Sequence, residues 1–164
     1  MLERNPAFLS KPITFLILIL SGFVPGHSQS ASRSSETPAS ERSLLAQSYA
    51  SERLWVWQRR LNLQDWNVSV VVSRAGELKP RTLGNVHWDL DKKTAVIRVL
   101  DPADYRLAPS LILRDIELTV VHELIHLEIA PALADLHRTD ANREQEEKAV
   151  NRMADALLLL DRRQ

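Results

Sequence analysis

The segment from Leu111 to Ala130 constrains the fold of this chain more than any other, because it contains no Pro or Gly and is apolar on most of its faces. A segment of this length that is apolar nearly all round forms a buried helix. Pro131 follows directly and disfavours the helical conformation at Ala130. We therefore expect a buried helix over residues 111–130, and we expect it to end before Pro131.

Two histidines and a glutamate interrupt this apolar segment, in the sequence His122-Glu123-Leu124-Ile125-His126. Residues four apart lie on one helix face, one turn apart, so His122 and His126 can bind one metal ion. Glu123 lies slightly off that face, where its carboxylate can reach a water on the metal without being a ligand. Burying these groups without partners is unfavourable, and a metal ion would satisfy all three. The alternative is a pair of core histidines that hydrogen-bond to carbonyl groups.

A third ligand is needed if the metal is a tetrahedral zinc ion that keeps one position open. The chain contains no cysteine, so the ligand must be His, Asp or Glu. The connection after the motif offers Asp135 and His137, and the last predicted helix offers Glu144, Glu146 and Glu147. The apolar stripe of that helix leaves Glu144 pointing away, with Glu146 and Glu147 on either side of the stripe. Helix geometry alone does not choose between those two.

The motif resembles the active-site helix of the zincin metallopeptidases. Thr119 stands where these enzymes favour Val or Thr, and the residues around the motif are uncharged except for Glu128. The metzincin subgroup expects Gly and His at two later positions, which Ile129 and Ala132 occupy here. The similarity is therefore to the compact gluzincin-like type, in which a Glu on the following helix is the third ligand.

The resemblance also separates Glu147 from Glu146. In small zinc peptidases of this type the ligand Glu commonly stands in a Glu-x-x-x-Asn-x-x-Ala arrangement, which Glu147, Asn151 and Ala154 match. The resemblance thus implies Glu147 as the third ligand. The other interpretation of residues 144–147 is an acidic helix start that faces solvent.

By this resemblance the chain would be a zinc-dependent peptidase that acts on a peptide or protein substrate. His122, His126 and Glu147 would hold Zn²⁺, and Glu123 would act as the general base. The side chain that stabilises the oxyanion stays open among four candidates, His87, Tyr105, His137 and Arg143.

Two other function classes stay open. One is a zinc-containing binding or regulatory module without turnover, and the other is a metal-dependent hydrolase of a non-peptide bond. Glu123 favours an enzyme, because a purely structural metal site has no use for that carboxylate. The formal net charge is zero, with 21 basic and 21 acidic residues, which does not fit an electrostatic nucleic-acid binder.

The rest of the domain predicts an α+β fold. Its elements are a helix over residues 44–61, strands over 66–73, 83–90 and 94–100, and a last helix over 141–161. Asp91-Lys92-Lys93 suits a hairpin turn, and Asp140 is the expected N-cap of the last helix. We expect an N-terminal helix, a small three-stranded antiparallel sheet, the motif helix and a C-terminal helix that carries the third ligand. By resemblance, the strand over 83–90 would be the sheet edge that holds an extended peptide.

The N-terminal segment has a separate character. Arg4 and Lys11 precede an apolar run over residues 13–24, and Gly26 and Ser28 stand at the small-residue positions of a cleavage site. This pattern predicts a signal peptide over residues 1–28 and a secreted or periplasmic protein. The alternative is a retained anchor helix, which alone would bring the protein to a membrane. A Ser-rich flexible linker over residues 29–43 and a working domain over residues 44–164 would follow.

Overall fold

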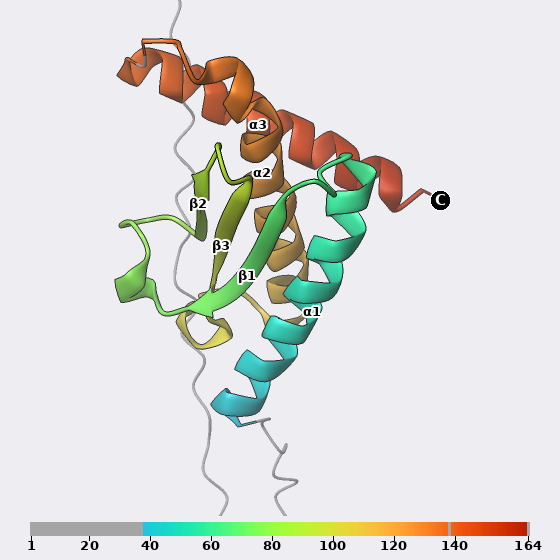
Figure 1. The fold of residues 1–164 in the computed structure, drawn as a ribbon. Helices are drawn as coiled ribbons and strands as arrows, with labels where there is room; N and C mark the ends of the chain where they lie inside the picture. Colours follow the sequence, from blue (N-terminus) through green and yellow to red (C-terminus); the bar gives the residue numbers. More distant parts are fainter. Residues whose placement is uncertain (1–37, 138, 164) are drawn as a thin grey trace, which may run out of the picture. The chain divides into compact units, whose positions relative to one another are not determined.

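The computed structural model describes residues 38–137 and 139–163, which form an α+β domain (Figure 1). Its main elements are α1 (Ala39–Arg60), β1 (Asn67–Ser73), β2 (Gly84–Asp89), β3 (Thr94–Leu100), α2 (Pro109–Leu133) and α3 (Asp140–Asp161). The predicted signal peptide lies outside the described residues, as does most of the predicted linker. The described end of that linker is helical, because α1 begins at Ala39. None of the helices in the described ranges has both the length and the hydropathy that a membrane span requires.

The sheet is mixed, so the prediction of an antiparallel sheet is wrong for one of its two pairings. β2 and β3 form the predicted antiparallel hairpin, but β1 pairs with β3 in parallel, and the strand order is β1-β3-β2. The physical reason is the apolar character of β3, where Ala95, Ile97 and Val99 are all buried and favour the central position. The connection over residues 74–83 therefore carries the chain past β3 to the opposite edge.

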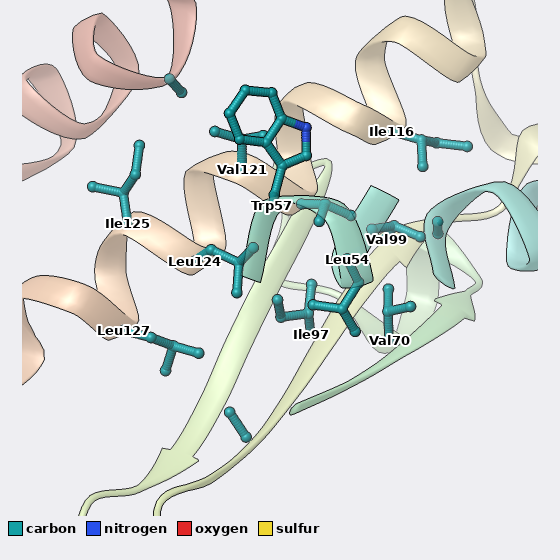
Figure 2. Close-up of a cluster of buried hydrophobic side chains, with 14 of the residues drawn as sticks. Leu54, Trp57, Val70, Ile97, Val99, Ile116, Val121, Leu124, Ile125 and Leu127 are labelled. Atoms are coloured by element: carbon teal, nitrogen blue, oxygen red, sulfur yellow. The ribbon is translucent and has the colours of Figure 1, made fainter. Parts of the chain in front are cut away.

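One face of the sheet packs against α1 and α2, and α3 packs against α2. Figure 2 shows this core, in which side chains of β1 and β3 meet those of α1 and α2. Its central members are Leu54 and Trp57 of α1, Val70, Ile97 and Val99 of the sheet, and Ile116, Val121 and Leu124 of α2. α2 contributes residues to this core on several sides, as expected of a helix that is apolar nearly all round.

Two helix ends differ from the prediction. α2 does not end before Pro131 but continues to Leu133. Proline in the last turn removes only one intrahelical hydrogen bond, and the packing of the preceding turns outweighs that loss. The N-cap of α3 is Thr139, not Asp140, because the Thr139 hydroxyl accepts the Asn142 N–H at 3.2 Å. Asp140 instead lies in the first turn, where its charge suits the helix dipole.

A buried carboxylate on α2 joins the helices. Glu117 accepts hydrogen bonds from Arg53 Nε at 2.7 Å, from Trp57 Nε1 at 2.9 Å and from the Tyr49 hydroxyl at 3.2 Å. Arg53 also reaches Asp161 at the end of α3. Burial, and then the Glu117 charge, raise the pKa of Tyr49 to about 12, so Tyr49 stays a donor at neutral pH. A buried charge with several partners of this kind fixes the rotation of α2 about its axis.

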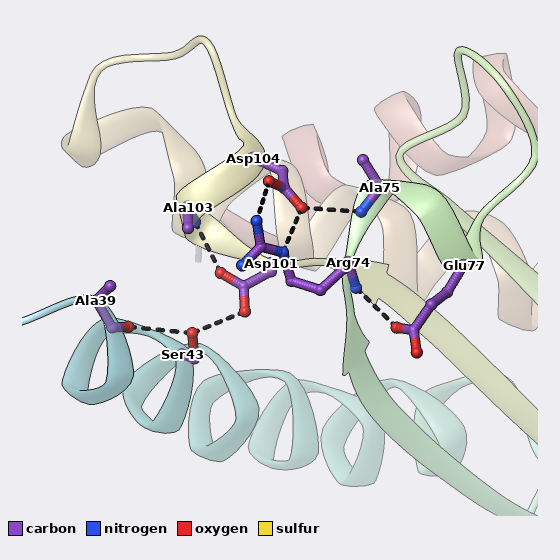
Figure 3. A network of polar contacts seen from close by, with 8 residues as sticks. All are labelled: Ala39, Ser43, Arg74, Ala75, Glu77, Asp101, Ala103 and Asp104. Atoms are coloured by element: carbon purple, nitrogen blue, oxygen red, sulfur yellow. Dashed lines mark hydrogen bonds and ion pairs between the residues drawn. The ribbon is translucent and has the colours of Figure 1, made fainter.

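A second polar network ties the ends of β1 and β3 to the start of α1 (Figure 3). Asp101, which follows β3, accepts hydrogen bonds from Ser43 Oγ at 2.7 Å and from Ala103 N at 2.8 Å. Arg74, which follows β1, donates two hydrogen bonds to Asp104 at 2.8 and 2.7 Å. These contacts hold the end of the sheet from which the connection to β2 departs.

The start of β2 approaches α2 closely at Gly84. A Cβ atom at this position would lie 2.6 Å from the Arg98 carbonyl oxygen and would also overlap the Thr119 methyl group. Gly76, in contrast, has nothing within 4 Å of the place where a Cβ would stand. Of the two glycines in the described ranges, Gly84 is therefore the one required for close packing between this strand and the motif helix.

We predict that Gly84→Ala lowers the free energy of unfolding by about 1–3 kcal/mol, the usual range for overpacking. Urea denaturation monitored by circular dichroism measures this difference. Gly76→Ala is the matched control, and it should lie within about 0.5 kcal/mol of the wild type. Equal effects of the two substitutions would contradict the close approach of β2 to α2.

Candidate metal centre

The two motif histidines meet at their Nε2 atoms. His122 and His126 lie one turn apart on α2, and their Nε2 atoms are 3.1 Å apart. Their ring planes are inclined at 67°, with centroids 4.8 Å apart. Only 15% and 9% of the two side chains is exposed. Two nitrogen atoms this close, both directed to one point, are what a shared metal ion requires.

The other ring nitrogens both face hydrogen-bond acceptors on α3. His122 Nδ1 lies 3.1 Å from Asn151 Oδ1, and His126 Nδ1 lies 3.0 Å from Glu146 Oε1. An acceptor opposite Nδ1 selects the tautomer that carries its proton there and leaves the Nε2 lone pair free. Burial, and then the neighbouring His126, lower the pKa of His122, which favours the neutral ring that a metal binds.

Glu146 and Glu147 occupy different places in the site. Both carboxylate oxygens of Glu147 approach the histidines, with Oε2 3.3 Å from His122 Nε2 and Oε1 3.3 Å from His126 Nε2. Glu146 reaches the far side of His126, at Nδ1. Thus Glu147 lies where the two free lone pairs converge, whereas Glu146 orients one of the rings.

Glu123 lies beside the histidines in a largely buried position, with 7% of its surface exposed. Burial raises the pKa of its carboxyl to about 8, and the Glu147 charge raises it while Lys79 lowers it. A dication nearby would lower that pKa, because an opposite charge favours the carboxylate. The donor atoms of His122, Glu123 and His126 lie within 4.8 Å of one another, and this group could hold a metal ion.

The histidines open into a cleft of about 740 Å³. Its walls come from the connection before β2, from β2 itself, and from the facing sides of α2 and α3. A volume of this size is typical of sites that take a small molecule or a segment of a chain. The candidate metal centre therefore faces a cleft large enough for such a ligand.

Among the residues that the structure describes, no strand pairs with the outer edge of β2, and this free backbone edge borders the cleft. The Leu100 N–H donates to the Leu83 carbonyl at 2.9 Å, which makes these two residues a hydrogen-bonded pair at the start of the antiparallel ladder. In an antiparallel ladder, hydrogen-bonded pairs alternate with non-hydrogen-bonded ones, so Gly84, Val86 and Trp88 fall in the non-hydrogen-bonded pairs. These three residues direct their N–H and C=O groups away from β3. All three residues line the cleft.

The opposite edge of the sheet is closed by a side chain. The Gln47 amide on α1 donates to the Val70 carbonyl at 2.8 Å and accepts the Val72 N–H at 2.9 Å. A glutamine in this position occupies backbone groups of β1 that another strand would need. Of the two edges, β2 is thus the one that can accept a further strand.

Other residues considered from the sequence lie elsewhere, with one exception. His87 is exposed and points to the sheet face away from the helices, since its partner Val96 alternates with the buried residues of β3. His137 and Asp135 are exposed and do not line the cleft. Tyr105 is partly buried near Asp115 and does not line the cleft either. Of the four candidate oxyanion donors, only Arg143 does.

The structure adds cleft residues that the sequence did not reveal. Lys79 and Arg81 line the cleft from the connection before β2, and Asp115 lines it two turns before His122 on α2. The two cations stand in a loop without a motif, so no local pattern could identify them. The sequence did carry a signal for Asn151 as a partner of His122. Asn151 follows Glu147 by four residues, which puts both on one helix face.

Comparisons of the chain with models of protein families, with curated proteins and with solved structures found no match.

We predict that a divalent metal raises the melting temperature of the protein and that a chelator reverses the rise. At a metal concentration of about 100 times Kd, binding stabilises the folded state by about 2.7 kcal/mol, which shifts the melting temperature by several degrees. His126→Ala should remove the metal-dependent shift, since it removes one Nε2 atom. His87→Ala is the control and should keep the shift, because His87 lies on the other sheet face. A chelator-insensitive melting temperature in the metal-loaded wild type would argue against the site.

Proposed function

We propose that this protein is a zinc-dependent peptidase. The observation that carries the proposal is the convergence of the Glu147 carboxylate on both histidine Nε2 atoms, with the buried Glu123 carboxyl beside them. Two histidines and a glutamate form an open three-ligand set that is found in zinc hydrolases. The proposed ligands are therefore His122, His126 and Glu147.

The donor set fits zinc. Two neutral imidazoles and one carboxylate suit zinc better than magnesium or calcium, which prefer oxygen ligands alone. Asn151 and Glu146 would keep the rings in the required tautomer and orientation. A bound zinc ion would supply Lewis-acid chemistry, lowering the pKa of a water molecule toward neutrality and polarising a carbonyl group.

Glu123 is the proposed general base. Its carboxylate borders the cleft next to the proposed ligands but pairs with neither histidine ring in the hydrogen bonds of the described residues. From this position it can accept a proton from a water molecule in the cleft and return it to the leaving amine. Arg143, on the α3 wall of the same cleft, is the remaining candidate for stabilising negative charge on the carbonyl oxygen.

The free edge of β2 supports a peptide as the substrate. An extended peptide can add to an exposed strand edge through main-chain hydrogen bonds, which bind without regard to sequence. Gly84, Val86 and Trp88 offer these groups along the wall opposite the histidines. The signal pattern over residues 1–28 supports an exported enzyme, secreted or periplasmic.

We predict that Glu147→Gln and Glu146→Gln, two substitutions of the same size, differ strongly in zinc affinity. The amide of Glu147→Gln is a poor ligand, and the loss should exceed the roughly 10–100-fold typical of residues that only support a ligand. Glu146→Gln keeps an oxygen that can accept the His126 Nδ1 proton, so its loss should stay within roughly that range. Competition of each variant with a chromogenic chelator measures the affinities. A larger loss in Glu146→Gln would reverse the assignment of the third ligand.

We predict that Glu123→Gln loses at least about a hundredfold in peptide hydrolysis, because an amide cannot accept the water proton. Its zinc content should stay near that of the wild type, since Glu123 is not a proposed ligand. A digest of a peptide library with and without chelator, read by mass spectrometry, provides the assay. His126→Ala serves as the comparison and should lose metal and hydrolysis together.

Two outcomes would count against this function. Full hydrolysis by Glu123→Gln would mean that another group is the base. A zinc-loaded wild type that cuts no peptide in the library would favour a binding or regulatory module instead.

A further inference from the structure

The row of α2 residues that bears the histidines continues with two alanines. His122, His126, Ala130 and Ala134 are each four residues apart, and residues at this spacing form one ridge along a helix. Ala130 is buried, and Ala134 is exposed at the end of the helix. The ridge therefore changes from large side chains at the metal centre to small ones in the next two turns.

A second cavity, of about 130 Å³, lies over these alanines. Its apolar lining comes from Trp88 and Leu90 at the end of β2 and from Ala130, Leu133 and Ala134 of α2. Trp88, Leu90 and Leu133 are only partly buried, so apolar surface remains open at the mouth. A cavity of about 150 Å³ with an apolar lining has room for a benzene ring, so this one can hold a branched aliphatic or a small aromatic group.

This cavity adjoins the candidate active site. His126, Glu146 and Trp88 line both the large cleft and the small cavity. The backbone of Trp88 also belongs to the free edge of β2, where a peptide main chain would bind. A side chain of a bound peptide could thus enter the cavity while its main chain pairs with β2.

The direction of the strands decides which half of the substrate reaches the cavity. Gly84 packs against Thr119, and Trp88 shares a cavity with Ala130, so β2 and α2 run in the same direction. Antiparallel pairing is the more common and slightly more stable arrangement of two strands. A peptide antiparallel to β2 has its N-terminal half at the Trp88 end.

We propose that this cavity is a subsite for an apolar side chain on the acyl side of the bond that is cut. The inference rests on the proposed peptidase function and deepens it. The alanines create the space, Trp88 and Leu90 cover it, and His126 connects it to the metal centre. Leu or Phe in the N-terminal half of the substrate fits the cavity, whereas an acidic side chain would lose its hydration there and face the Glu146 carboxylate, which also lines the cavity.

The test compares peptides that differ only on the acyl side. Wild-type zinc enzyme should cut a peptide with Leu there roughly tenfold or more faster, in kcat/KM, than one with Gly, as is typical of apolar pockets. Ala134→Leu fills the mouth of the cavity and should bring this ratio close to one. Ala132→Leu is the matched control, since Ala132 is also exposed near the end of α2 but lines neither cavity. It should keep the wild-type ratio.

A binding measurement separates this inference from the proposed function. In Glu123→Gln the peptides stay intact, and isothermal titration calorimetry should give a lower Kd for the Leu peptide than for the Gly peptide. Adding Ala134→Leu should abolish that difference. If the wild type cuts nothing but the binding difference appears and depends on Ala134, the subsite stands and the peptidase function fails. If the wild type cuts both peptides equally, or if Ala134→Leu keeps the preference, the subsite is wrong.

Discussion

The burial of α2 is the constraint on which the rest of the structure depends. This helix is covered by the sheet and α1 on one side and by α3 on another, so each polar group that it buries needs a partner from a neighbouring element. Glu117 finds its partners on α1, through Arg53 and Trp57. The motif histidines find theirs on α3. Because these contacts use different faces of one rigid helix, the network at Glu117 also holds the histidines in their orientation.

α3 divides its polar residues between two tasks. Glu146 and Asn151 accept hydrogen bonds from the far nitrogens of the two rings, whereas Glu147 approaches their near nitrogens. A metal ion held by Glu147 and the two Nε2 atoms would bind all three of these groups at once. This division of roles follows from the helix period, since adjacent residues differ by about 100° in direction.

The mixed sheet connects the fold to the proposed function. Parallel pairing of β1 with β3 leaves β2 as the outer strand, and that strand alone borders the cleft. Gln47 closes the other edge, which leaves β2 to accept an extended chain. The close approach at Gly84 and the small apolar cavity over Ala130 and Ala134 then give the two ends of this wall different chemistry. A cleft with one open edge and one apolar end is suited to binding a peptide in a defined direction.

Local spacing in the sequence was enough to predict the motif helix, the two histidines on one face, the β2–β3 hairpin and the last helix, because helix period and turn chemistry act over a few residues. Local spacing could not choose between Glu146 and Glu147 as the third ligand. It also could not predict that β1 pairs in parallel or that Lys79 lines the cleft. Those features depend on how α3 is rotated against α2 and on which strand occupies the centre of the sheet. Packing between segments far apart in the chain sets both, and no short pattern encodes such long-range contacts.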